Sequence, residues 1–89
     1  MGLNYEKVSE TLKALAHPAR LKIVVGLLKD ECNVAQIQKV LGLPQSTISQ
    51  HLRILKNADI IKGRREGTKT CYRVIDARVR KIVEIIKRK

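Results

Sequence analysis

Two short amphipathic segments joined by a tight corner constrain the fold of this chain more than any other feature. Apolar residues recur at helical spacing over 34–41 and predict a short helix that ends at Gly42, a residue suited to the left-handed conformation of a helix end. Pro44 and the hydroxyl residues after it favour the start of a second helix over 45–57. The second helix has a thin apolar stripe, formed by Ile48, Leu52 and Leu55. This spacing is typical of a helix-turn-helix unit, here over 34–57.

The polar surface of the second predicted helix contains no acid. Because no Asp or Glu occurs from 43 to 58, nothing on this helix would repel a phosphate. Glutamine amides can bond adenine, and hydroxyls or arginine can bond bases or phosphates, when such a helix enters the major groove of DNA. The predicted DNA-contacting residues of this helix are Gln45, Ser46, Thr47, Ser49, Gln50, His51 and Arg53. The alternative is a capped, solvated helix in an all-α bundle.

The segments on either side complete the predicted architecture. Apolar periodicity predicts three more helices, over 5–16, 20–28 and 76–88. His17-Pro18 separates the first two, because the residue before proline avoids the helical region. Residues 60–75 read as two strands around a turn that contains glycine. We therefore expect a single domain over 1–89, mostly α with a small β-hairpin wing, in the order α-α-α-α-β-β-α of a winged helix-turn-helix.

Basic residues gather on the predicted hairpin. Arg64, Arg65 and Lys69 lie at or near its turn, with Lys62 close by. A basic hairpin beside a reading helix can contact the DNA backbone or the adjacent minor groove, so we predict that the first three contact DNA. The alternative is an edge hairpin whose charges protect it from aggregation.

Composition narrows the function class. Nineteen Lys and Arg against eight Asp and Glu give a net charge of +11 in 89 residues, which favours a nucleic-acid partner over a membrane surface. Two cysteines are too few for a secreted disulfide framework, and no apolar stretch approaches a membrane span, so we expect a cytoplasmic protein. The sequence has no acid pair in a plausible pocket, no phosphate-binding loop, and no Ser or Cys with a positioned His, so it does not indicate an enzyme.

Two long stretches, "LKALAHPARLKIVVGLL" and "LGLPQSTISQHLRILKNADIIKGRREGTKTCYRV", resemble the ArsR/SmtB family of bacterial and archaeal repressors, in register over nearly the whole chain. The resemblance implies a winged helix-turn-helix homodimer that binds palindromic operator DNA and usually represses transcription. It also implies that His17 and Arg20, in the family's His-Pro-x-Arg-Leu run, have structural roles. Many relatives release DNA when they bind a metal or when their thiols are oxidised.

The metal sites of the family do not carry over to this chain. Asn33-Val34-Ala35 stands where the arsenic, cadmium and lead sensors have Cys-Val-Cys. Asp76-Ala77-Arg78 stands where the zinc and nickel sensors have Asp-x-His, and arginine cannot ligate a metal. We therefore expect no metal and no cofactor, and the sequence indicates no effector.

Cys32 and Cys71 are the remaining candidates for a sensing role. The family fold places the segment before the third helix against the second wing strand, where a disulfide would be reachable if the Cβ atoms face each other. Basic neighbours (Lys29, Lys69 and Arg73) would favour the reactive thiolate, so a redox switch is one hypothesis. The alternative is that both cysteines act as small hydrophobic residues.

The first and last helices have apolar stripes larger than a small winged domain needs. We predict that they form a dimer interface from Val8, Leu12, Leu15, Val79, Ile82, Val83 and Ile86. A two-fold dimer would set two reading helices ~34 Å apart, one turn of DNA, and predicts a palindromic site. The alternative is that both stripes pack within one subunit.

Two further functions stay open at this point. An architectural protein would bind nucleic acid through charge alone, although the glutamines on the reading helix and the scarcity of aromatics argue against it. A repressor without any effector would be controlled by its own abundance.

Overall fold

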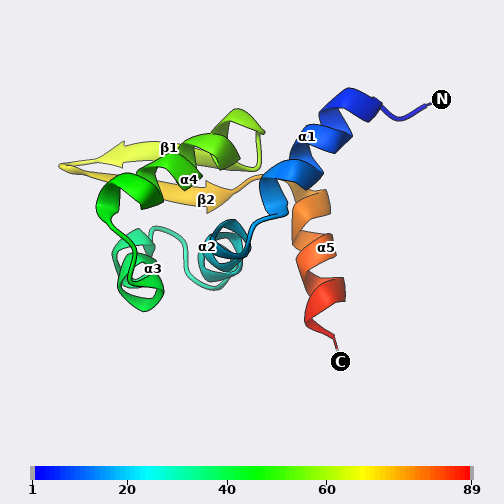
Figure 1. Ribbon diagram of the computed structural model, residues 1–89. Helices are drawn as coiled ribbons and strands as arrows, with labels where there is room; N and C mark the ends of the chain where they lie inside the picture. Colours follow the sequence, from blue (N-terminus) through cyan, green and yellow to red (C-terminus); the bar gives the residue numbers. More distant parts are fainter. Residues whose placement is uncertain (1, 89) are drawn as a thin grey trace.

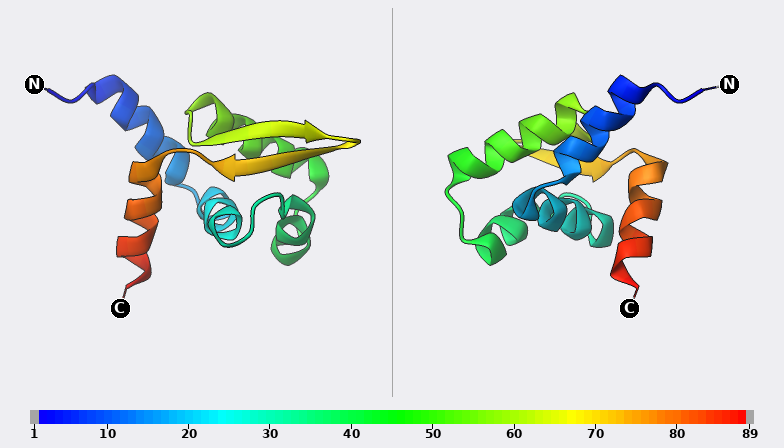
Figure 2. Two further views of the ribbon diagram at one scale, coloured as in Figure 1. Left: turned by 180° about the vertical axis from the view of Figure 1, so that it is seen from behind. Right: turned by 45° about the vertical axis from the view of Figure 1, so that its right-hand side comes forward.

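The computed structural model describes residues 2–88, which form five helices and one two-stranded antiparallel sheet in the predicted order (Figure 1). Met1 and Lys89, the ends of the predicted domain, lie outside the described residues. The elements are α1 (Tyr5–Leu15), α2 (Pro18–Lys29), α3 (Val34–Leu41), α4 (Gln45–Asn57), β1 (Ile61–Glu66), β2 (Lys69–Val74) and α5 (Ala77–Lys87). The hairpin tip points away from α1 and α5, so the molecule has two distinct ends (Figures 1 and 2).

The corners of the helix-turn-helix form as the sequence predicts. Gly42 adopts a left-handed conformation with φ +66°, and its N–H donates to the Gln38 carbonyl to close α3. The Gln38 side chain donates to the Leu43 carbonyl at 3.4 Å, which holds the turn. α4 then begins at Gln45, directly after Pro44.

The helix α2 begins earlier than the predicted range of 20–28. Pro18 is its first residue, and the Nδ1 atom of His17 accepts from the Ala19 N–H at 3.1 Å to cap the helix. Proline suits this position because a first-turn N–H has no partner within the helix. The same proline therefore both ends the preceding segment and starts α2.

The hairpin register sorts its residues into two faces. Ile61 pairs with Val74, Arg64 with Cys71, and Glu66 with Lys69, around a turn in which Gly67 has φ +65°. Because side chains alternate along a strand, one face carries the apolar residues that pack on the core, Ile61, Tyr72 and Val74. The other face carries Lys62, Arg64, Glu66, Lys69, Cys71 and Arg73.

The core is aliphatic and centres on α2. Ile23, Val24 and Leu27 of α2 are almost fully buried, together with Ile48 and Leu55 of α4. The core also includes Ile60, Ile61, Val79 and Val83. This packing fixes α4 by its apolar stripe and leaves its polar residues outside.

Part of the predicted dimer interface belongs to this core. Leu15, Val79 and Val83 have only 5%, 0% and 2% of their surface exposed within a single subunit. They have almost no apolar surface left for a partner, so for these three the alternative of packing within one subunit is correct. Val8 and Ile82 are partly buried, whereas Leu12 and Ile86 are exposed. Three further apolar residues, not among the predicted interface residues, are also exposed. They are Leu3, just before α1, Tyr5 in α1, and Ile85 in α5.

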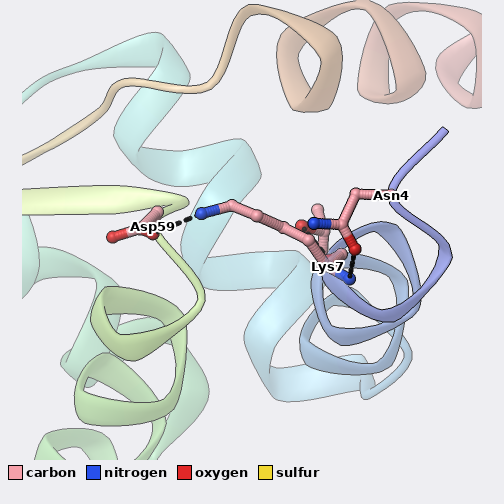
Figure 3. A network of polar contacts seen from close by, with 4 residues as sticks. Asn4, Lys7 and Asp59 are labelled. Carbon is pink, nitrogen blue, oxygen red and sulfur yellow. Dashed lines mark hydrogen bonds and ion pairs between the residues drawn. The ribbon is translucent and has the colours of Figure 1, made fainter. Parts of the chain in front are cut away.

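Polar contacts fix the start of α1 (Figure 3). The Asn4 side chain accepts from the Lys7 N–H at 3.1 Å and caps the helix. The Lys7 ammonium forms an ion pair with Asp59, in the connection between α4 and β1, at 3.0 Å. Both groups are exposed, so the ion pair contributes little to stability and mainly orients α1.

Candidate nucleic-acid interface

The N-terminal half of α4 presents polar side chains to solvent. Ile48, Leu52 and Leu55 are buried, which turns the opposite face of the helix outward. Among the predicted DNA contacts, Gln45, Ser46, Ser49, Gln50 and Arg53 are exposed. Thr47 is only partly exposed. The arrangement gives a rigid helix whose outward amides, hydroxyls and guanidinium can donate and accept hydrogen bonds.

The hairpin adds a cationic surface to this helix. Lys62, Arg64, Lys69 and Arg73 share one face, and all four are exposed. Arg65 is exposed too but lies on the opposite face. The sequence reading did not predict Arg73 as a DNA contact, although the strand register places it opposite Lys62.

Glu66 forms an ion pair with Arg64, one of these cations. The Arg64 Nε atom donates to a Glu66 carboxylate oxygen at 2.9 Å, and an outer guanidinium nitrogen contacts the same oxygen. The side chains of both residues are at least half exposed, so the pair is weak and can exchange for a phosphate. The remaining guanidinium N–H groups of Arg64 can also donate to a phosphate while this pair is formed.

A disulfide joins Cys32 to Cys71 across 39 positions, with the Cα atoms 4.2 Å apart. The Cys32 N–H donates to the Tyr72 carbonyl at 3.1 Å, so the segment before α3 lies against β2 as the family fold implies. Cys32 is exposed and left-handed with φ +68°, whereas Cys71 is buried. The bond ties the loop before α3 to the cationic face of the hairpin.

The surroundings of the disulfide do not suit a metal. Cys32, Cys71 and Glu66 bring their ligand atoms within 4.8 Å of one another, the one such group among residues 2–88. The two sulfurs are bonded to each other, and Lys62, Arg64 and Arg73 line a cavity of about 240 Å³ beside Cys71. Glu31 also lines this cavity, but the three cations outweigh it, disfavour a bound cation and favour an anion or a thiolate.

His51 is turned inward, toward α2. Its Nδ1 atom lies 3.3 Å from a guanidinium nitrogen of Arg20, and its ring lies 4.7 Å from the ring of His17. Partial burial, then the charge of His17 and then that of Arg20 lower the pKa of His51 below its ordinary value of 6.5. The sequence reading predicted a DNA contact at this position and did not anticipate these neighbours.

The comparisons with known proteins agree with this geometry. Residues 17–62, just over half of the chain, match the model of the arsR family of bacterial regulatory proteins. This chain belongs to the ArsR family. The matched span runs from the cap of α2 into β1 and therefore includes the whole helix-turn-helix.

Relatives cover almost the whole ArsR-family chain. An HTH-type transcriptional regulator of Methanocaldococcus jannaschii is 43% identical over 83 residues, which is 92% of this chain and 93% of that protein. The crystal structure of the transcriptional repressor PagR of Bacillus anthracis has a TM-score of 0.81 and 41% identity, over 92% of this chain and 94% of that one. A homodimeric winged helix-turn-helix DNA-binding domain from Mycobacterium bovis has a TM-score of 0.83 and 31% identity, over 93% of this chain and 77% of that one.

These findings establish the class of the protein. The ArsR-family chain is a DNA-binding transcriptional regulator with a winged helix-turn-helix fold, and its relatives are regulators and not enzymes. Among residues 2–88, none of the helices has the length and apolar character needed to cross a membrane.

Proposed function

We propose that this regulator is a cytoplasmic, homodimeric repressor. It would read a palindromic operator with α4 and bind the flanking DNA backbone with its hairpin. The observation that carries the proposal is the acid-free polar face of α4, exposed in the same domain as a hairpin face with four cations. A protein that used charge alone would need no amides there. Gln45 and Gln50 can distinguish adenine in the major groove, because each amide both donates and accepts.

The dimer follows from apolar surface at the end opposite the hairpin tip. Leu12 of α1 and Ile85 and Ile86 of α5 are 51%, 64% and 57% exposed, and nothing within the subunit covers them. The Mycobacterium bovis relative is homodimeric, and PagR is a repressor, which supports the same assembly and direction of regulation here. A two-fold axis at this end would present two α4 helices to successive turns of DNA.

A pair of substitutions separates reading from anchoring. Gln45→Ala should reduce the preference for operator over unrelated DNA by about tenfold or more, because a bidentate amide contact supplies ~1–3 kcal/mol of discrimination. Arg65→Ala should weaken binding to all duplexes about equally and reduce the salt dependence by about one released ion.

The measurement is competition binding with a selected operator and a scrambled duplex at several salt concentrations. Lys81→Ala is the matched control, because Lys81 is an exposed cation on α5, outside α4 and the hairpin. Uniform loss of affinity in both variants would contradict the division of roles. Equal protection of every duplex in a footprint, with a steep salt slope, would favour an architectural protein.

A thiol-redox response is a second candidate, and the Cys32–Cys71 disulfide is the observation that favours it. Two thiols lose two electrons and two protons to an oxidant, such as a low-molecular-weight disulfide, to form the bond. The bond fixes the loop before α3 to β2, so its reduction would loosen this loop, which leads into the helix-turn-helix, relative to the hairpin. Reduced protein should therefore bind operator several-fold more weakly than oxidised protein.

Mass spectrometry under non-reducing conditions would establish the thiol state of each sample used for operator binding. Cys32→Ser and Cys71→Ser should each resemble the reduced protein and no longer respond to oxidant. If the wild-type protein binds operator equally in both thiol states, the redox response is excluded and the disulfide is structural.

A further inference from the structure

Three elements meet at one half-buried arginine. The Arg20 Nε atom, in the first turn of α2, donates to the Ala14 carbonyl in the last turn of α1 at 2.6 Å. An outer nitrogen of the same guanidinium reaches His51 Nδ1, in the middle of α4, at 3.3 Å. The helix expected to form the dimer is thus connected, through one side chain, to the helix expected to read DNA.

The chemistry of this contact fixes the protonation of His51. A guanidinium can only donate, so His51 Nδ1 must accept and its proton must be on Nε2. His17 has the same constraint, since its Nδ1 accepts the Ala19 N–H. A second proton on His51 would remove the acceptor and place a positive charge beside Arg20 and, across 4.7 Å, the His17 ring.

His51 lies next to the proposed reading surface, so its contact with Arg20 can affect that surface. Ser49 and Gln50, two of the exposed residues of the proposed reading surface, directly precede His51 on α4. Side chains that read a ligand need support that fixes them to about 0.5 Å. Arg20 and His17 support this turn of α4 on its inner side.

We propose that Arg20 is a positioning residue that couples α1 to the reading helix through neutral His51, so that protonation of His51 weakens operator binding. The proposal rests on the proposed function, since it concerns the affinity for a specific operator. The Arg20 guanidinium contacts Ala14 and His51, so its proposed role is to support α4.

The charged groups nearest His51 favour its neutral form. From α2 they are His17 and Arg20, and both lower the pKa of His51. From α1, Glu10 and Lys13 line a surface cavity of about 300 Å³ together with Arg20. Lys56 of α4 and Lys62 of β1 line a separate surface cavity that does not include His51. Because the pKa of His51 is lowered from 6.5, its neutral form predominates at pH 7.5 and protonation requires a lower pH than for an ordinary histidine.

The sign of the pH dependence separates this role from direct contact. A histidine that bound phosphate would strengthen DNA binding when protonated, because the added charge attracts the backbone. A histidine that must accept from Arg20 weakens specific binding when protonated. The change cannot exceed about tenfold per pH unit, because a single proton is involved.

The test is operator affinity of the full chain between pH 5.5 and 8 at constant ionic strength, with a scrambled duplex as reference. Specific affinity of the wild type should fall as the pH decreases below about 6.5. His51→Asn should show a flat pH profile, because its amide oxygen replaces Nδ1 as the acceptor and does not titrate. His17→Asn should keep a pH dependence but shift it to higher pH, because asparagine still caps α2 while the His17 charge that lowers the pKa of His51 is removed.

Arg20→Lys provides a second measure that does not depend on His51 variants. It keeps the charge but replaces the planar fork, so one ammonium must serve both acceptors, and operator affinity at pH 7.5 should fall several-fold with a shallower pH profile. Specific binding that strengthens in acid, or identical profiles for the wild type, His51→Asn and Arg20→Lys, would overturn the proposal. Absence of operator preference at every pH would instead reject the proposed function.

Discussion

At the scale of single residues, Gly26 shows how closely α2 and α3 pack. A Cβ atom at this position would lie 2.8 Å from both Cγ1 and Cδ1 of Ile37. Real Cβ atoms do not approach carbon this closely, so any larger residue must displace Ile37, which is itself buried. The glycine therefore sets the distance between the central helix and the first helix of the helix-turn-helix.

Substitution at this contact should be destabilising. Gly26→Val should lower the free energy of unfolding by ~1–3 kcal/mol, because overpacking forces Ile37 and α3 to shift. Chemical denaturation monitored by circular dichroism would measure the effect. Lys22→Val is the control, since Lys22 is exposed on the same helix and a valine there meets no buried neighbour, although lysine favours the helix more than glycine does. Equal stability of the two variants would mean that α3 adjusts without cost.

At the scale of elements, the sequence predicts most of the helix and strand bounds that depend on neighbouring residues. The bounds of α3 and α4 follow from Gly42 and Pro44, whose backbone preferences act on their immediate neighbours. The predicted wing over 60–75 contains both observed strands. The predicted start of α2 at Arg20 is two residues late, although proline suits a first helical turn, and Pro18 is in fact the first residue of α2.

The sequence could not predict contacts between distant parts of the chain. His51 lies between the polar face of α4 and its apolar stripe, so its periodicity is compatible with either an inward or an outward ring. Arg20, 31 positions earlier, determines the inward orientation. Apolar stripes present the same ambiguity. Val79 and Val83 look identical to interface residues until the structure shows that their own subunit covers them.

At the scale of the whole molecule, the proposed activities lie at opposite ends. The chain is elongated, 43 by 31 by 20 Å, with a radius of gyration of 13.1 Å. The hairpin tip occupies one end, and α1 and α5 lie toward the other (Figure 2). Dimerisation at the second end would leave the first end of each subunit free for DNA.

Charge placed on the proposed dimer surface should therefore separate the subunits. The double variant Leu12→Glu, Ile85→Glu should sediment as a monomer and bind a palindromic operator at least 100-fold more weakly, because two half-sites are no longer engaged together. Sedimentation velocity and fluorescence anisotropy would measure the two effects.

Ile75→Glu is the control for sedimentation, because Ile75 is 46% exposed but lines a surface cavity with residues of α4 and β1. If the double variant remains a dimer, the interface lies elsewhere on the molecule. If it becomes a monomer with undiminished operator affinity, dimerisation does not contribute to DNA binding.

The Cys32–Cys71 bond also has a consequence for the unfolded chain. It closes a loop that contains α3, α4 and β1, so the entire helix-turn-helix lies inside a covalent ring. For a separation of 39 positions, the lost chain entropy of the unfolded state amounts to about 4 kcal/mol at 25 °C. In a domain of this size that is a large share of the total stability. Reduction of this bond would therefore lower the stability of the whole helix-turn-helix against unfolding.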